Sequence, residues 1–197
     1  MYIKDWKKEV FTIPNVLSMI RLAMIPLYIL IYLNARNELD YFVSAGILAV
    51  SCLTDLIDGK IARHFNMIST LGKILDPLAD KATQFTLIIC LAIRKNMALL
   101  WALIVLFVAK EGFQLVAGSL ILRKGKTLAG ALLTGKICTA ILFISLVLMI
   151  MLPSLPRKAI STIVIVDSCF MILSFISYIL VYAGKIHFIQ DIEGKKE

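Results

Sequence analysis

The sequence predicts an all-α integral membrane protein, a bundle of six transmembrane helices preceded by a short N-terminal interfacial amphipathic helix. The chain has 197 residues, of which 60% are hydrophobic and 17% are charged, a composition that is rare in a soluble domain and typical of a membrane bundle. Its mean hydropathy is +0.89. Six apolar stretches reach the roughly 20 residues that a helix needs to cross a bilayer. They cover about 14–33, 41–62, 76–94, 97–121, 131–152 and 159–183.

The first ten residues carry the pattern of a helix that lies along the membrane surface. Ile3, Trp6 and Val10 recur at helical spacing, and charged residues occupy the other face. Such a helix places its aromatic ring at the level of the lipid headgroups. The alternative is a charged leader exposed to solvent. The connections between the later stretches are short and contain no linker, so residues 1–197 are expected to form a single domain.

Basic residues in the connecting segments predict the orientation in the membrane. One side collects Lys4, Lys7, Lys8, Lys60, Arg63, Lys73, Arg123, Lys124, Lys126, Lys185, Lys195 and Lys196. The other side collects Arg36, Arg94, Lys95, Arg157 and Lys158. Because short loops rich in Lys and Arg stay in the cytoplasm, both termini are expected there, in a multi-pass protein of the cell (plasma) membrane. The net charge of +8 then reflects topology and attraction to anionic lipid, and no basic stripe indicates nucleic-acid binding.

Four aspartates form the most informative cluster in the chain. Asp55 and Asp58 end the second predicted span, and Asp76 and Asp80 begin the third. Residues three or four apart share a helix face, and a short connection makes the two helices antiparallel neighbours, so the four carboxylates are expected to converge on the cytoplasmic side. Ionised carboxylates at a membrane boundary indicate function, and their oxygens suit hard divalent cations. The alternative is that they are helix-end charges paired with nearby lysines and arginines.

Small and basic residues at fixed offsets favour a site for phosphate chemistry. Gly59 lies inside a helix, where glycine costs about 1 kcal/mol relative to alanine, and this indicates close approach to its backbone. Ala62 keeps the same face open further along the helix. Arg63 adds a planar cation that suits a diphosphate, and Gly72 precedes the second acidic pair.

Residues 55–80 match the pattern D-x2-D-G-x2-A-R-x8-G-x3-D-x3-D at every specified position. This run is similar to the signature of the CDP-alcohol phosphatidyltransferase family, which the chain also resembles in length and in its six spans. Members of that family move a phosphatidyl group from a CDP-linked lipid such as CDP-diacylglycerol to an alcohol and release CMP. The resemblance therefore implies a metal-dependent membrane enzyme, and it also implies a homodimer.

The resemblance implies roles for individual residues. Two divalent cations, Mg²⁺ or Mn²⁺, are expected to be bound by Asp55, Asp58, Asp76 and Asp80. Asp80 is also expected to be the catalytic base that takes the proton from the acceptor hydroxyl. The first span begins with the run 15–21, N-V-L-S-M-I-R, which resembles the N-x-L-[TS]-x-x-R of glycerophosphate-type members. The residues expected to bind the CDP-linked lipid are Asn15, Ser18, Arg21, Gly59, Arg63, Ser69 and Gly72.

The chemistry is consistent with these roles. The charge on a diphosphate repels nucleophiles, and metal ions that bridge its oxygens neutralise this charge and stabilise CMP as it leaves. The attacking alcohol must lose a proton, and general-base catalysis of that step contributes typically about 10²–10⁴-fold. A single displacement without a covalent enzyme intermediate is the simplest mechanism.

The expected acceptor is glycerol 3-phosphate, which would give phosphatidylglycerophosphate, and the alternative is phosphatidylglycerol in a cardiolipin-forming reaction. Gly135-Lys136 with Thr139 resembles the G-K-x-x-T run that both types of enzyme share, and Lys136 is expected to bind the acceptor phosphate. Lys110-Glu111 lies in the fourth span where glycerophosphate-type members carry Arg-Glu, and an internal Lys–Glu or Lys–Gln pairing between helices is the alternative role. The acceptor-binding candidates are Lys136, Lys110, Lys81 and Arg123.

Two other classes of protein share some of these features. A prenyl-diphosphate transferase also uses paired aspartates and magnesium, but on separated helices of generally longer chains. A transporter would carry its acids near the bilayer midplane, often within an inverted repeat, and the sequence shows no internal repeat. The cysteines, Cys52, Cys90, Cys138 and Cys169, fall singly within predicted spans, so neither a disulfide framework nor a zinc site is expected.

Overall fold

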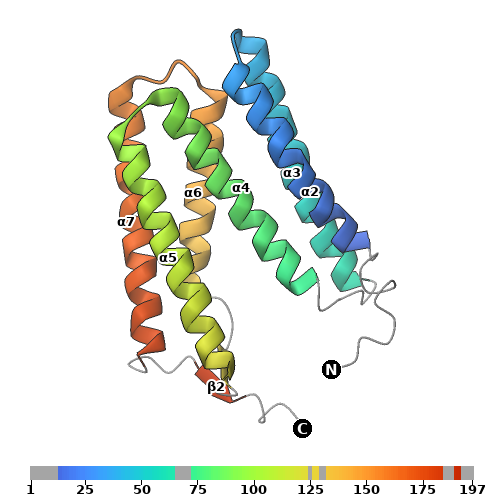
Figure 1. Cartoon of the computed structure of the whole chain (residues 1–197), viewed down its shortest axis with the longest axis vertical. Helices are drawn as coiled ribbons and strands as arrows, with labels where there is room; N and C mark the ends of the chain where they lie inside the picture. The colour runs from blue at the N-terminus through green and yellow to red at the C-terminus, as the bar shows by residue number, and fades with distance from the viewer. Residues whose placement is uncertain (1–12, 65–71, 124–125, 129–131, 184–188, 192–197) are drawn as a thin grey trace. The chain divides into compact units, whose positions relative to one another are not determined.

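The computed structural model of the chain describes residues 13–64, 72–123, 126–128, 132–183 and 189–191 (Figure 1). Its side chains are described for residues 15–51, 75–123 and 132–183. The chain divides into two compact units, and each is described by itself. Unit 1 is Met1–Lys95 with Val147–Ser154, and unit 2 is Asn96–Leu146 with Leu155–Glu197.

Six helices occupy the positions of the six predicted spans within the described ranges. They are α2 (Ile13–Asn34), α3 (Glu38–His64), α4 (Gly72–Lys95), α5 (Ala98–Arg123), α6 (Leu133–Met151) and α7 (Arg157–Tyr182). Among the described residues, four stretches are long and apolar enough to cross a membrane, namely Asn15–Asn34 of α2 and the whole of α5, α6 and α7. A helical membrane protein is confirmed to that extent, and the count of six spans stays a prediction. The interfacial helix predicted for residues 1–10 lies outside the described residues.

A small pair of strands adds to the helices that the sequence predicts. β1 (Lys126–Leu128) pairs with β2 (Ile189–Asp191) in antiparallel register, with Thr127 opposite Gln190. The expectation of a wholly α-helical chain is therefore incomplete at this point. Strands of three residues are too short to show the alternating hydrophobic pattern by which a strand is recognised.

Polar contacts at both ends show that α2 and α4 run parallel in unit 1. Near the starts of the two helices, Arg21 of α2 forms an ion pair with Asp80 of α4. Near their ends, Arg94 of α4 donates hydrogen bonds to the carbonyl oxygens of Leu33, at 2.9 Å, and of Ala35. α2 packs against both α3 and α4. Because α3 begins directly after the short turn at the end of α2, it runs back toward the end that carries Arg21 and Asp80.

Arg94 also joins the beginning of α3 to this arrangement. Its Nε and Nη2 donate to the Tyr41 hydroxyl at 3.0 and 2.5 Å, and its guanidinium carbon lies 5.4 Å from the centre of the Tyr41 ring. Tyr41 in turn meets Tyr32 of α2 edge to face, with ring centres 5.8 Å apart. Arg94 therefore satisfies carbonyl groups that the end of α2 leaves without a helical partner and holds three helices together.

Local sequence signals explain how the helices of unit 1 begin and end. The Asp40 carboxylate accepts hydrogen bonds from the backbone N–H groups of Arg36, at 2.7 Å, and Asn37, at 3.1 Å, as an acidic residue in the first turn of a helix does. These two bonds hold the pKa of Asp40 below its usual range. α4 ends at Lys95, where Asn96 takes a positive φ of 47°, a conformation that asparagine tolerates better than most residues.

The start of α4 differs from its predicted boundary. The sequence predicts a span from about residue 76, with Pro77 in the first turn, but the helix begins at Gly72 and contains Pro77 in its second turn. Hydropathy locates the apolar part of a helix, whereas the backbone continues the helix into polar residues beyond it. As a result, both Asp76 and Asp80 lie well inside the helix and not at its first residue.

Unit 2 is held together by apolar packing between α5 and α7 and by buried polar contacts between α6 and α7. Phe113 of α5 meets Phe175 and Tyr182 of α7 edge to face, at 5.4 and 5.9 Å between ring centres. Deep in the same unit, the Ser145 hydroxyl of α6 donates to Asp167 of α7 at 2.9 Å. A carboxyl group buried in this way needs such a partner.

We predict that replacing Arg94 destabilises the protein. Arg94→Met removes the donor for the Leu33 and Ala35 carbonyls and for Tyr41, and leaving buried acceptors without a donor costs about 1–3 kcal/mol each. The free energy of unfolding, measured by denaturant titration in detergent micelles, should fall by at least that amount. Arg36→Met is the control, because it removes an exposed arginine at the same end of the unit, and such changes stay within about 0.5 kcal/mol. Equal losses in the two variants would contradict the prediction.

Candidate functional site

A buried polar stripe runs along the first turns of α2. Asn15, Ser18 and Arg21 are three residues apart, so they lie on one face of the helix. The three residues are exposed by only 0%, 0% and 2%, although they begin an otherwise apolar helix. Buried polar groups require partners, so the stripe marks a place where α2 meets other polar residues.

The partners of this stripe include the second acidic pair of the sequence. The Ser18 hydroxyl donates to Oδ1 of Asp76, and Nη1 of Arg21 donates to Oδ1 of Asp80 at 2.8 Å. The structure thus brings together two predicted motifs that are distant in the chain. Ser18 and Asp76 are 58 residues apart, and Arg21 and Asp80 are 59 residues apart. The sequence predicted Ser18 and Arg21 as contacts of a CDP-linked lipid and missed these bonds. The regular spacing of polar residues in an apolar run was the signal that could have indicated them.

The Arg21–Asp80 ion pair is buried on one side and open on the other. The Arg21 side chain is 2% exposed, whereas that of Asp80 is 48% exposed. A buried guanidinium requires oxygen acceptors for its N–H groups, and Asp80 supplies one of them. The exposure of Asp80 also leaves its carboxylate within reach of a substrate. One residue can therefore serve both the packing of α2 and chemistry at the surface of the site.

The donor atoms at this end of unit 1 fit a hard divalent cation. Asp76 uses Oδ1 for Ser18, and within the described residues its second oxygen has no partner. α3 includes Asp55 and Asp58 in one continuous helix that runs toward the same end, although their side chains lie outside those described. Carboxylate oxygens are the ligands that Mg²⁺ and Mn²⁺ prefer. Among the described residues alone, no group of three or more metal-binding side chains is present, so the convergence of all four aspartates stays a prediction.

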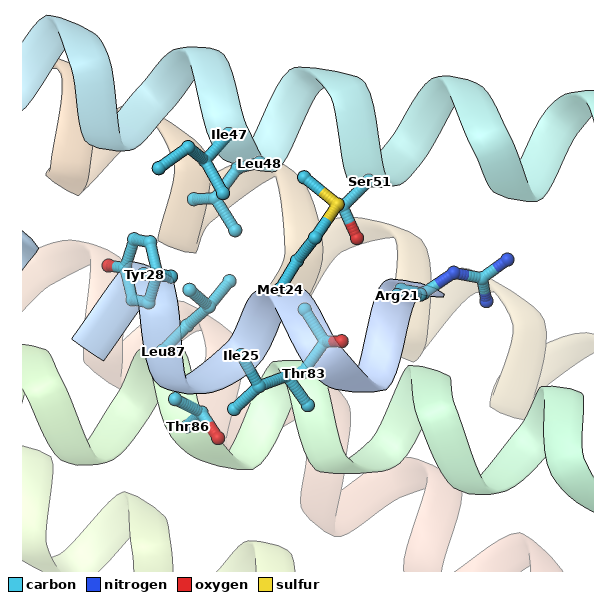
Figure 2. Close-up of a pocket in the computed structure, with 10 residues that line it drawn as sticks. All are labelled: Arg21, Met24, Ile25, Tyr28, Ile47, Leu48, Ser51, Thr83, Thr86 and Leu87. Atoms are coloured by element: carbon cyan, nitrogen blue, oxygen red, sulfur yellow. The ribbon is translucent and has the colours of Figure 1, made fainter. Parts of the chain in front are cut away.

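A pocket lies beside this site between α2, α3 and α4 (Figure 2). It is lined by Arg21, Met24, Ile25, Tyr28, Ile47, Leu48, Ser51, Thr83, Thr86 and Leu87. Figure 2 shows the guanidinium group of Arg21 extending away from the apolar side chains of the pocket. The pocket is therefore mainly apolar, and its one charged lining residue, Arg21, extends its guanidinium group away from the apolar side chains.

The other predicted site residues fall into three groups. Arg63 and Gly59 lie on α3, and Gly72 begins α4, where side-chain surroundings are not described; Ser69 lies outside the described residues. Lys81 is partly buried in α4 of unit 1. The remaining acceptor candidates belong to unit 2, where Arg123 and Lys136 are exposed and Lys110 is buried; their role in binding the acceptor stays a prediction.

Lys110 has an internal partner within its own helix, whereas the alternative considered from the sequence was a pairing between helices. It is 2% exposed, and its Nζ donates to Oε1 of the adjacent Glu111 at 2.7 Å. A buried ammonium group requires such a carboxylate. The pairing explains why these two charges are tolerated in an apolar helix, and a contact between Lys110 and an acceptor stays a prediction.

Gly135, which precedes Lys136 in the predicted acceptor motif, has a packing role. A Cβ atom at this position would lie 2.6 Å from the hydroxyl oxygen and 3.0 Å from Cε2 of Tyr178. Tyr178 is itself buried, with 8% of its surface exposed. The glycine therefore lets α6 approach the ring of Tyr178, a contact that sequence reasoning did not identify.

A family model for CDP-alcohol phosphatidyltransferases matches residues 11–183. This chain belongs to that family. The resemblance inferred from residues 55–80 is confirmed, and with it the assignment to a family of transferases. The matched range contains the stripe of α2, the four aspartates and the whole of α5, α6 and α7.

Several curated CDP-alcohol phosphatidyltransferases are similar to the chain. The cardiolipin synthase (CMP-forming) of Streptomyces coelicolor is 40% identical over 121 residues, which cover 59% of this chain and 54% of that protein. The human cardiolipin synthase (CMP-forming) is 44% identical over 84 residues, 41% of this chain and 24% of that protein. The probable phosphatidylglycerophosphate synthase of Mycobacterium tuberculosis is 28% identical over 121 residues, 60% of this chain and 57% of that protein. The matches thus cover between 24% and 57% of the length of these relatives.

We predict that Gly135→Ala destabilises the protein by about 1–3 kcal/mol, the usual range for an overpacked site. The added methyl group would meet the rigid ring of Tyr178. Adding Tyr178→Phe removes the atom in closest contact and should restore part of the loss. Gly112→Ala is the matched control, because nothing lies within 4 Å of its Cβ position, and alanine is favoured over glycine in a helix by about 1 kcal/mol. Denaturant unfolding of the four proteins in detergent measures these differences, and a stable Gly135→Ala variant would contradict the packing role.

Proposed function

We propose that the protein transfers a phosphatidyl group from CDP-diacylglycerol to phosphatidylglycerol, forming cardiolipin and releasing CMP. One comparison carries the choice of acceptor. Over the same aligned length of 121 residues, identity is 40% to a cardiolipin synthase and 28% to a probable phosphatidylglycerophosphate synthase. The sequence motifs taken alone favoured glycerol 3-phosphate over phosphatidylglycerol, whereas we now propose phosphatidylglycerol first.

Glycerol 3-phosphate is kept as the second candidate because of specific residues. The run from Asn15 to Arg21 resembles that of glycerophosphate-type members, and Lys136 with Thr139 resembles a run that both types share. In either case the acceptor offers a glycerol unit, and it also offers a phosphate group. We assign the binding of that phosphate to Lys136, Lys110, Lys81 and Arg123.

The proposed mechanism is a single displacement at the phosphatidyl phosphorus. Two divalent cations, Mg²⁺ or Mn²⁺, held by Asp55, Asp58, Asp76 and Asp80 would neutralise the diphosphate and stabilise CMP as it leaves. Ser18 orients Asp76 through its hydrogen bond. Arg21 holds one oxygen of Asp80, and the exposed part of the Asp80 carboxylate takes the proton of the attacking hydroxyl. CDP contacts are assigned to Asn15, Gly59, Arg63, Ser69 and Gly72.

The bilayer determines where this reaction takes place. The acyl chains of both lipids remain among apolar helices, whereas the nucleotide requires water, so the site belongs at the membrane boundary. We place this boundary on the cytoplasmic side of the plasma membrane, because the basic residues of the short loops lie there. We further propose that the protein acts as a homodimer.

The acceptor is tested by measuring CMP release from CDP-diacylglycerol by the purified full-length protein. We expect phosphatidylglycerol to give the highest kcat/KM, glycerol 3-phosphate to give less, and serine or inositol phosphate to give none. A reversed order of the first two would favour the second candidate. Absence of CMP release with all four acceptors would refute the proposed function.

Asp80→Asn tests the catalytic base. The amide retains an oxygen that can accept the bond from Arg21, so the fold and CDP-lipid binding should persist. CMP release should fall about 10²–10⁴-fold, the usual contribution of a general base. Asp40→Asn is the control, because Asp40 lies at the opposite end of unit 1 and serves the start of α3. If Asp80→Asn released CMP at nearly the wild-type rate, the assignment of Asp80 as the general base would be wrong.

Removal of metal tests the cation site. Treatment with a chelator should abolish CMP release, and Mg²⁺ or Mn²⁺ should restore it. Asp76→Asn should raise the concentration of Mg²⁺ needed for half-maximal activity at least about tenfold, a usual consequence of losing a ligand or its support. Full activity in the presence of chelator would exclude the two-cation mechanism.

A further inference from the structure

Gln84 is a buried polar residue to which neither the fold nor the proposed mechanism gives a role. Its side chain is 7% exposed, and within the described part of the chain its Oε1 is buried without a hydrogen-bond partner. Gln84 follows Asp76 and Asp80 at intervals of four residues on α4. Residues at this spacing lie above one another on a helix, so Gln84 continues the acidic stripe by one further turn.

An amide oxygen left in this state destabilises the protein. A buried acceptor without a donor costs about 1–3 kcal/mol, and a leucine or methionine of similar size would avoid the loss. The neighbouring Thr83 shows the usual solution, because its hydroxyl donates to the Ala79 carbonyl of the same helix at 2.8 Å. An unsatisfied acceptor one turn from the proposed base indicates that a bound molecule supplies the donor.

The chemistry of that donor follows from the position of Gln84. A neutral amide oxygen accepts a hydrogen bond from a hydroxyl group and does not bind a phosphate oxygen. Side chains four residues apart on a helix have Cβ atoms roughly 5–6 Å apart. Two acceptors at this separation can bind two hydroxyl groups on adjacent carbon atoms.

We propose that Gln84 is a specificity-determining residue that accepts a hydrogen bond from the hydroxyl next to the one that attacks. The site then recognises a vicinal diol, with the attacking hydroxyl at Asp80 and its neighbour at Gln84. This inference rests on the proposed function. Phosphatidylglycerol and glycerol 3-phosphate both carry such a diol, so the inference holds for either acceptor.

The test pairs each acceptor with an analogue that lacks the second hydroxyl. Phosphatidylglycerol is compared with phosphatidyl-1,3-propanediol, and glycerol 3-phosphate with 3-hydroxypropyl phosphate, by the kcat/KM for CMP release with full-length protein. The wild type should prefer the diol about 10–100-fold, as expected when a buried polar group is left unpaired. The two pairs show separately which source of the diol the protein uses.

Gln84→Met removes the amide oxygen and keeps the length of the side chain. In this variant the preference for the diol should fall below about threefold, mainly through lower kcat/KM for the diol, because the hydrogen bond that favours it is absent. Thr83→Val is the matched control. It removes a hydroxyl that is already satisfied within the helix, so the preference should remain that of the wild type.

Several results would overturn the inference. Equal kcat/KM values for the diol and its analogue in the wild type would overturn the inference. This measurement needs no variant, so it holds even if Gln84→Met fails to fold. An equal loss toward both members of a pair in Gln84→Met would mean that Gln84 serves packing alone. Absence of CMP release by the wild type with every acceptor would instead overturn the proposed function, and with it the inference that rests on it.

Discussion

The parallel pairing of α2 with α4 through two arginines is the constraint on which the rest of unit 1 depends. Arg21 extends from α2 to Asp80 of α4 near one end, and Arg94 extends from α4 to the last carbonyl groups of α2 near the other. Apolar side chains alone would allow one helix to slide along the other, because lipid-facing and helix-facing surfaces are equally apolar. A slip of one turn would break both sets of polar contacts, so the two arginines determine the register.

This register orients the carboxylates before any substrate binds. Asp76 is held by Ser18, and Asp80 by Arg21, so under the proposed mechanism neither side chain would need to be ordered during the reaction. Preorganised charges of this kind contribute more to catalysis than charges that must move. The same bonds satisfy the polar stripe of α2, whose burial would otherwise destabilise the helix. Stability of the helix pair and readiness for chemistry thus depend on the same atoms.

The sequence predicts the helices well because each is recorded in a local apolar pattern. It fails where structure depends on contacts between distant segments. The bond from Ser18 to Asp76 joins residues 58 positions apart. The spacing of polar residues on α2 indicates a buried polar face, but it does not identify the partner of that face. The meeting of Gly135 with Tyr178 is another such case, since only the fold shows what lies beside a glycine. For Lys110 the sequence left open a pairing between helices, whereas the structure shows the adjacent Glu111 as its partner.

Under the proposed function, the polar stripe of α4 would also limit how far along the helix an acceptor can reach. It begins at Asp76 and ends at Gln84, and the next residues on the buried side of the helix are Leu87, Ile88 and Leu91, each 0% exposed. The turn and a half that follows Gln84 on this side of the helix is therefore apolar. An acceptor that entered further would lose hydrogen bonds to water without replacement. Under the proposed function, the hydroxyl groups of the acceptor would therefore bind between Asp76 and Gln84, before the apolar part of the helix begins.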